Sequence, residues 1–280
     1  VAAALAASAA GCAVAPQWPV SAEFAGTTVV TQVDSLAAVG LLEGREPGDP
    51  SLDAIAKSWR DRLPSAPELA DVARRWSPDV AALLLWRQVE RGAVGDGLVA
   101  EYRRALRRTD APAPSLQGEL FLLVPGWLYL SDRTSGADLE RQARVLRAHG
   151  ARVVRVDTDE NGTVAANAAR VADAVRHAAS GPERVTLVSA SKGGAEVALA
   201  LSQLARNGEA DAVQAWVNIG GTLRGTALAD LALTWPMCWF VQAAVLNNAS
   251  FDALRSVAVA ASAERADALQ LPARLRVVNL

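Results

Sequence analysis

The chain has 280 residues, of which 51% are hydrophobic, so it is long and apolar enough to bury a sizeable core. Its formal net charge of -2 and sequence pI near 5.8 exclude the strongly basic surface of a nucleic-acid-binding protein. It has two cysteines, too few for a disulfide framework, and its sequence has no Cys/His cluster with metal-site spacing. We therefore expect no metal, no cofactor and no nucleic-acid partner.

Residues 1–16 resemble part of a secretory signal or lipoprotein leader. Small apolar residues without charge fill positions 1–15, as in the hydrophobic region of an export signal. The sequence AAGC, which ends at Cys12, resembles a bacterial lipobox, whose cysteine becomes lipidated. An alanine-rich disordered end explains the same composition equally well. Cys12 is thus a candidate for lipidation and membrane anchorage in the cell envelope; without a signal, we expect a cytoplasmic protein.

Residues 17–116 are typical of a helical region followed by a linker. The sequence is loop-like up to about residue 50, with one short helix predicted over residues 35–42. Apolar residues at three-and-four spacing predict four further helices: residues 51–63, 66–76, 78–91 and 98–108. The expected N-caps are Ser51, Ser65 and Ser77, and the expected core tryptophans are Trp59, Trp76 and Trp86. The proline-rich segment 110–114 predicts a linker.

Residues 117–280 change to short apolar strands that alternate with helices. The predicted strands are residues 119–124, 151–156, 184–189, 213–219 and 275–280, and the predicted helices are residues 136–148, 164–180 and 195–207. Strands with few polar positions, separated by helices, indicate an α/β fold with a parallel sheet covered by helices on both faces. In such sheets, functional sites lie at the carboxyl edge of the strands.

A strand, a sharp turn and a helix are predicted to meet at Ser191. In a nucleophile elbow, a serine occupies a strained turn so that its hydroxyl projects from the carboxyl end of a strand. The strand and helix then come close together, so the residues two before and two after the serine must be small. Here these residues are Ser189 and Gly193, with Gly194 following. A small-residue turn without a catalytic role is the alternative.

A serine nucleophile also needs hydrogen-bond donors for the oxyanion. These are usually the backbone N–H after the serine and one from the loop that follows an earlier strand. Lys192 supplies the first, and we expect Trp127, which follows Gly126 after the predicted strand 119–124, to supply the second. An ordinary strand-to-loop turn would also need Gly126.

Three stretches in this order resemble bacterial lipases of the α/β-hydrolase superfamily. VTLVSASKGG (residues 185–194) resembles their elbow, with Ser189 where glycine is usual. PGW (residues 125–127) looks like their His-Gly-x oxyanion loop, with Pro125 in place of histidine, and NIGGTLRGTALAD (residues 218–230) is similar to the segment after their next strand. The resemblance implies a serine hydrolase that cleaves small-molecule or lipid carboxylic esters through an acyl-enzyme on Ser191.

The general base of such an enzyme is normally a histidine that follows the serine and an acid in the chain. The chain has two histidines, His149 and His177, and both precede Ser191. Each lies near the carboxyl end of a predicted helix, so we expect both at the opposite edge of the sheet. The acid and histidine are then expected beyond residue 280. The alternative is a non-catalytic binding protein of the cell envelope with the same fold.

Residues 157–162 match the first half of a calcium-binding loop. The twelfth position is Ala168, where such a loop requires a bidentate glutamate. We therefore interpret the stretch as polar capping without a metal, and expect Asp157 at the rim of the site.

Overall fold

The computed structural model describes residues 17–24, 27–45, 49–59, 62–91, 104, 115–234 and 251–280. The chain divides into two compact units, residues 1–112 and 113–280. Cys12, the predicted linker 110–114 and, apart from residue 104, the predicted helix 98–108 lie outside the described residues. None of the helices in the described ranges is both long and apolar enough to cross a membrane.

The first unit combines an antiparallel β-hairpin with helices. Its strands are β1 (Trp18–Phe24) and β2 (Thr27–Val33), and its described helices are α2 (Leu36–Leu42), α3 (Pro50–Ser58), α4 (Ala66–Arg75) and α5 (Pro78–Arg91). The loop predicted up to about residue 50 was therefore wrong where β1 and β2 lie, and the prediction of a purely helical N-terminal region was wrong for the same reason. Val20 and Val33 are buried in the core with the helices, so the hairpin is stabilised by packing as well as by its β-branched residues.

The helix starts of the first unit are set by polar caps. Ser65 and Glu68 form a capping box at α4, as expected of Ser65. The cap of α3 is Asp49 and not Ser51, because the Asp49 side chain accepts the Ser51 and Leu52 amides. Trp59 is 2% exposed and belongs to the core, whereas Trp86 is 42% exposed, so the core prediction was wrong for Trp86.

The second unit is built on a five-stranded parallel sheet with the strand order β4-β3-β5-β6-β7. The strands are β3 (Glu119–Val124), β4 (Arg152–Arg155), β5 (Arg184–Ala190), β6 (Val213–Ile219) and β7 (Arg276–Asn279). The described helices are the short η1 (Arg133–Ser135), α7 (Glu140–Ala148), α8 (Val164–Ala179), α9 (Lys192–Arg206), α10 (Ala227–Leu233), α12 (Phe251–Ser256) and α13 (Val259–Asp267).

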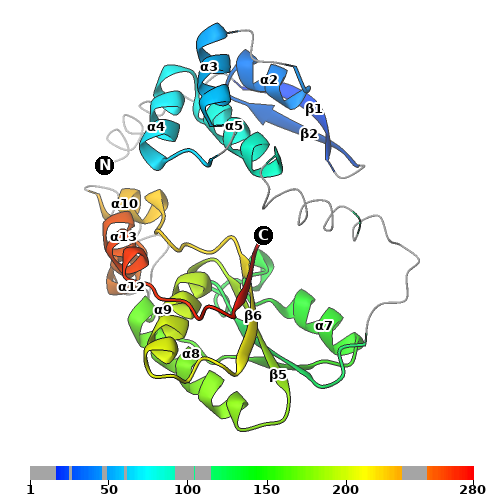
Figure 1. Ribbon diagram of the computed structural model, residues 1–280, viewed down its shortest axis with the longest axis vertical. Coiled ribbons are helices and arrows are strands. Elements are labelled where there is room, and N and C mark those ends of the chain that lie inside the picture. The colour runs from blue at the N-terminus through cyan, green and yellow to red at the C-terminus, as the bar shows by residue number, and fades with distance from the viewer. Residues whose placement is uncertain are drawn as a thin grey trace, which may run out of the picture. The chain divides into compact units, whose positions relative to one another are not determined.

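Helices cover both faces of this sheet. On β3, Leu120, Leu122 and Val124 pack into the cluster formed with α8 and α9. Leu123 and Phe121 point the other way and pack with residues of α7. Figure 1 shows α8 and α9 together on one side of the sheet and α7 on the other. The predicted α/β fold with a parallel sheet covered on both faces is confirmed.

Two helix starts differ from the sequence-based expectation. α9 begins at Lys192, directly after Ser191, and includes two glycines that the sequence favoured as turn residues. α7 begins only at Glu140, after η1 and after Leu139, which has a left-handed φ of 57°. The consequence for the site is that the first turn of α9 lies immediately beside Ser191.

Candidate functional site

Ser191 sits between the last residue of β5 and the first residue of α9. Its φ is 49° and its ψ is -121°, a combination that a residue with a side chain rarely adopts. The residue is exposed, whereas its neighbours Ala190 and Lys192 are buried. The hydroxyl group is therefore carried on a strained turn at the carboxyl edge of the sheet.

Three backbone hydrogen bonds hold Ser191 in this conformation. Its N–H donates to the Ile219 carbonyl over 3.0 Å, and its own carbonyl accepts from Gly194 N–H at 3.0 Å and Thr222 N–H at 3.1 Å. Strained backbone persists only where its surroundings fix it. Here the end of β6 and the segment after it supply most of that constraint.

Gly193 and Gly194 occupy positions where a side chain has no room. A Cβ on Gly193 would lie 2.6 Å from the carbonyl oxygens of Val124 and Pro125. A Cβ on Gly194 would run into Oδ1 of Asn218. The first turn of α9 therefore lies directly against the ends of β3 and β6, as the small-residue rule of the elbow requires.

Ser189 replaces the glycine that an elbow usually has two residues before the nucleophile. Its side chain is fully buried and accepts a hydrogen bond of 2.8 Å from Trp216 Nε1. Ser189 Oγ in turn donates to Oδ1 of Asn218, its register partner on β6, over 3.1 Å. The extra hydroxyl therefore faces the α9 side of the sheet, where its bonds to Trp216 and Asn218 of β6 accommodate it next to the turn.

The Gly126–Trp127 peptide lies next to Ser191. A Cβ built on Gly126 would lie 3.3 Å from Ser191 Cβ and 3.3 Å from the Ala190 carbonyl oxygen, so the two chain segments are in close contact. Gly126 N–H is occupied by the Ala137 carbonyl at 2.9 Å. No backbone acceptor is found for Trp127 N–H among the described residues. The structure thus brings Gly126, Trp127 and Ser191 together.

Lys192 N–H is the other expected oxyanion donor. Lys192 is the first residue of α9, and the first N–H groups of a helix have no acceptor within that helix. They also carry the partial positive charge of the helix start, which favours negative charge beside them. A group that becomes anionic beside Ser191 would meet these donors.

Sequence reasoning missed a buried polar network under the elbow. Lys192 Nζ forms an ion pair of 3.0 Å with Glu196 Oε1, and both side chains are almost completely buried. Asn167 Nδ2 donates to the same Glu196 oxygen over 2.7 Å. Burial raises the pKa of Glu196, and the charge of Lys192 and the Asn167 bond oppose this only in part. The i,i+4 spacing of lysine and glutamate was the available signal.

The two histidines lie at the other edge of the sheet, as expected. The His149 carbonyl accepts from Leu116 N–H at 2.8 Å, just before β3 begins, and its ring Nδ1 contacts the Val145 carbonyl at 2.7 Å. His177 is in the last turn of α8, shortly before β5 begins. Ser191 follows the other end of β5, which has seven residues and so spans about 20 Å. Neither histidine reaches Ser191.

Asp157 lines a hollow of about 390 Å³ between β4 and α7. The lining residues are Leu123, Asp138, Glu140, Ala143, Arg147, Arg155 and Asp157. Ser191 is not one of them. Asp157 therefore lines this hollow, and its predicted position at the rim of the Ser191 site stays a prediction.

Comparison with known proteins gives structural likeness only. No family model matches the chain, and no curated protein matches its sequence. A metagenomic carboxyl esterase of known structure is 24% identical with a TM-score of 0.47; the match covers 62% of this chain and 52% of the esterase. The Bacillus licheniformis lipase BlEst2 in mature form is 20% identical with a TM-score of 0.46, covering 61% of this chain and 68% of the lipase.

The propeptide form of the same lipase gives 20% identity and a TM-score of 0.44, over 60% of this chain and 37% of that one. This chain spans about half the length of the carboxyl esterase.

Proposed function

We propose that this protein is a serine hydrolase that cleaves carboxylic esters through an acyl-enzyme on Ser191. The observation that carries the proposal is the strained, exposed turn of Ser191 with the Gly126–Trp127 peptide against it. A turn of this kind is costly, and such strain is concentrated at functional sites. A turn that only joined a strand to a helix would not need it.

In the proposed reaction, Ser191 Oγ attacks the ester carbonyl carbon and its proton passes to a general base. The tetrahedral oxyanion accepts hydrogen bonds from the N–H groups of Trp127 and Lys192. The C–O bond to the alcohol breaks as the alcohol takes up the proton, leaving an acyl group on Ser191. Water then attacks the acyl carbon by the same route and releases the acid.

Neither histidine of residues 1–280 can serve as the general base of this mechanism. The chain has only His149 and His177, and the structure places both at the far edge of the sheet. We propose that a residue other than these two histidines takes up the proton. Such a base contributes several orders of magnitude to the rate.

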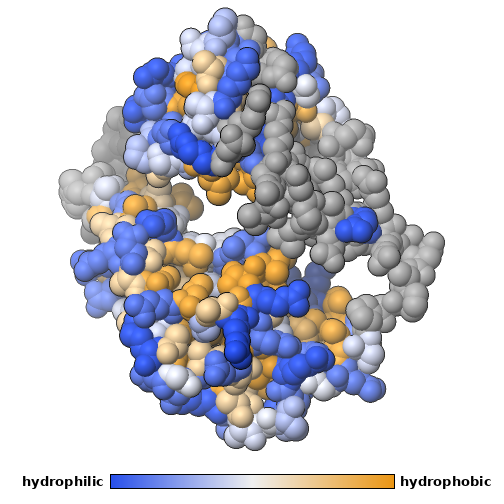
Figure 2. Space-filling view, in the orientation of Figure 1, coloured by the Kyte–Doolittle hydropathy of each residue, from blue (hydrophilic) through white to orange (hydrophobic). Residues whose placement is uncertain are grey.

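Apolar surface near the site suits an ester with a hydrophobic acyl or alcohol part. Leu228 and Leu231 on α10 are 75% and 54% exposed. The Trp127 ring packs in one cluster with Ala229 of the same helix, so α10 is adjacent to the proposed oxyanion loop. Figure 2 shows apolar side chains in patches between hydrophilic ones on the visible face of the second unit.

The proposal is tested with a fluorophosphonate probe, which forms a bond from phosphorus to a nucleophilic serine Oγ and releases fluoride. We expect labelling at Ser191, located by peptide mass spectrometry, and its loss in Ser191→Ala. Ser180→Ala is the matched control, because Ser180 is an exposed serine at the end of α8. A folded protein that no probe concentration labels at Ser191 would overturn the proposal and favour a non-catalytic binding protein.

A further inference from the structure

The loop between β4 and α8, residues 156–163, contacts both the elbow and the loop that follows β3. We call residues 125–132 the oxyanion loop, because they include the proposed donor Trp127. The three segments come from different parts of the sequence. Their contacts form one connected set of hydrogen bonds, which links the position of Trp127 to that of Lys192.

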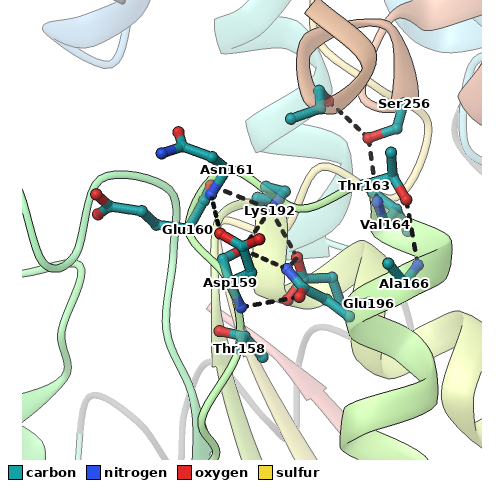
Figure 3. A network of polar contacts seen from close by, with 12 residues as sticks. Thr158, Asp159, Glu160, Asn161, Thr163, Val164, Ala166, Lys192, Glu196 and Ser256 are labelled. Atoms are coloured by element: carbon teal, nitrogen blue, oxygen red, sulfur yellow. Dashed lines mark hydrogen bonds and ion pairs between the residues drawn. The ribbon is translucent and has the colours of Figure 1, made fainter. Parts of the chain in front are cut away.

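On the elbow side, the β4–α8 loop is held by the buried network beneath α9. Asn167 Nδ2 donates to the Asp159 carbonyl over 2.7 Å, and Asp159 N–H donates back to Asn167 Oδ1 over 2.9 Å. Lys192 Nζ also approaches the carbonyl oxygens of Asp159 at 3.5 Å and Glu160 at 3.4 Å. Figure 3 shows Asp159 beside the Lys192–Glu196 pair, with the Glu160 side chain pointing away from it. This end of the loop is therefore fixed to the first turn of α9.

On the other side, Glu160 holds the oxyanion loop. Its Oε2 accepts the N–H groups of Leu130 at 2.9 Å and Ser131 at 3.1 Å, and its Oε1 accepts the Ser131 hydroxyl. One residue earlier in the oxyanion loop, the buried hydroxyl of Tyr129 donates to the Thr158 carbonyl over 2.7 Å. Four hydrogen bonds thus join these two loops.

The backbone between these bonds and Trp127 is itself constrained. Leu128 has a left-handed φ of 59°, which is unfavourable for a leucine. Such a conformation needs support from its surroundings. On the side toward Ser191, the backbone of Leu128 is held through Gly126, whose N–H donates to the Ala137 carbonyl. On the other side of Leu128, the support comes from the bonds to Thr158 and Glu160.

We propose that Glu160 is a positioning residue of the active site: through the amides of Leu130 and Ser131, it holds the oxyanion loop so that Trp127 N–H stays beside Ser191. The inference rests on the proposed function, since it assigns Glu160 a role in the reaction of Ser191. Glu160 acts through the loop and does not touch the substrate. A carboxylate suits the task, because hydrogen bonds from N–H groups to a charged acceptor are stronger than those to a neutral one.

The pKa of Glu160 agrees with this assignment. Burial acts to raise it, but the hydrogen bonds from the Ser131 hydroxyl and from the Leu130 and Ser131 amides outweigh burial and lower it. The side chain is therefore a carboxylate at neutral pH.

The test measures fluorophosphonate labelling of Ser191 in the wild type and in Glu160→Ala and Glu160→Gln. Removing one oxyanion donor costs roughly a hundredfold to a thousandfold in rate. Because Glu160 only positions that donor, we expect Glu160→Ala to slow the saturating labelling rate by about tenfold, with the half-saturating probe concentration unchanged. Glu160→Gln keeps one carbonyl acceptor and should be slowed less. Glu209→Gln is the matched control, because Glu209 is a surface glutamate that forms an ion pair with Arg176.

A readout that does not depend on Ser191 accompanies the labelling. Amide hydrogen exchange of a peptide covering residues 127–132 should be faster in Glu160→Ala, while urea unfolding reports on stability. If Glu160→Ala does not fold, Ser131→Gly replaces it and should show the same effects in smaller measure. Absence of labelling in the wild type would remove the proposed function and this role with it. Wild-type labelling with unchanged rates and exchange in the folded variants would overturn the role of Glu160 alone.

Discussion

Trp216 Nε1 donates a hydrogen bond of 2.8 Å to Oγ of Ser189, and neither side chain is reached by solvent beyond 1% of its surface. The bond joins neighbouring strands, β5 and β6, two residues before the strained turn of Ser191. The serine that departs from the usual glycine of an elbow is therefore a structural element of the sheet, and its hydroxyl has two defined partners on β6, Trp216 Nε1 and Asn218 Oδ1.

Ser189→Ala should destabilise the second unit, because it leaves the buried Trp216 N–H without its acceptor. Such a group costs about 1–3 kcal/mol of unfolding free energy. Urea unfolding, followed by tryptophan fluorescence and circular dichroism, measures the change. In the double variant Ser189→Ala with Trp216→Phe, donor and acceptor are both removed, so the loss should be less than the sum of the single losses. Unaltered stability of Ser189→Ala would contradict this account.

Gly126→Ala should mainly affect the labelling of Ser191, whereas Gly193→Ala should mainly affect stability. The Cβ added at Gly193 would meet backbone oxygens at 2.6 Å, which cannot move without shifting β3, so we expect a loss of about 1–3 kcal/mol in unfolding free energy. The Cβ added at Gly126 meets its neighbours at 3.3 Å, which a small shift relieves. Gly126→Ala should therefore fold but label more slowly at Ser191, because that shift moves the Trp127 peptide away.

Urea unfolding of both variants, with fluorophosphonate labelling of the folded ones, checks this contrast. Gly40→Ala in α2 is the control, because its nearest contact is an Arg45 side-chain atom at an ordinary 3.7 Å. Alanine favours a helix over glycine, so this variant should be slightly more stable. Equal unfolding free energies for Gly126→Ala and Gly193→Ala would show that the first turn of α9 does not pack closely against the end of β3.

Glu196 should make the stability pH-dependent. Burial raises its pKa in the folded protein above the unfolded value of 4.5, so the folded state holds the proton more tightly. The stabilisation from this group is complete below pH 4.5 and is lost as the pH rises through the folded pKa. Urea unfolding of the wild type and Glu196→Gln between pH 4 and pH 8 measures the effect. The wild type should lose stability relative to the variant as the pH rises, and parallel profiles would contradict the prediction.

His149→Ala and His177→Ala should label at Ser191 as fast as the wild type. His177 is exposed, His149 is half-buried, and both lie at the amino edge of the sheet, so neither can take the proton of the Ser191 hydroxyl. Substituting them singly and together, and measuring the fluorophosphonate labelling rate, checks this. A fall of tenfold or more in a folded variant would mean that one of them is the base.

Much of the second unit could be predicted because its signals are local. β3 and β6 have the predicted bounds, and the strand–turn–helix around Ser191 was recognisable from small residues between two apolar stretches. The β1–β2 hairpin was predicted as a loop, because its strands are stabilised by packing with the helices that follow them, α2 first of all. Trp86 follows the helical periodicity of α5 but is exposed.

Local patterns in the sequence are enough to predict the succession of strands and helices in the second unit and the small residues that flank Ser191. These properties follow from periodicity and residue size within a few neighbours. The contact of Gly126 with Ser191 and the hydrogen bonds from the oxyanion loop to Glu160 become visible only in the folded chain. The reason is physical: residues far apart in sequence meet only when the order of parallel strands brings their loops to one edge, and no local pattern encodes that order.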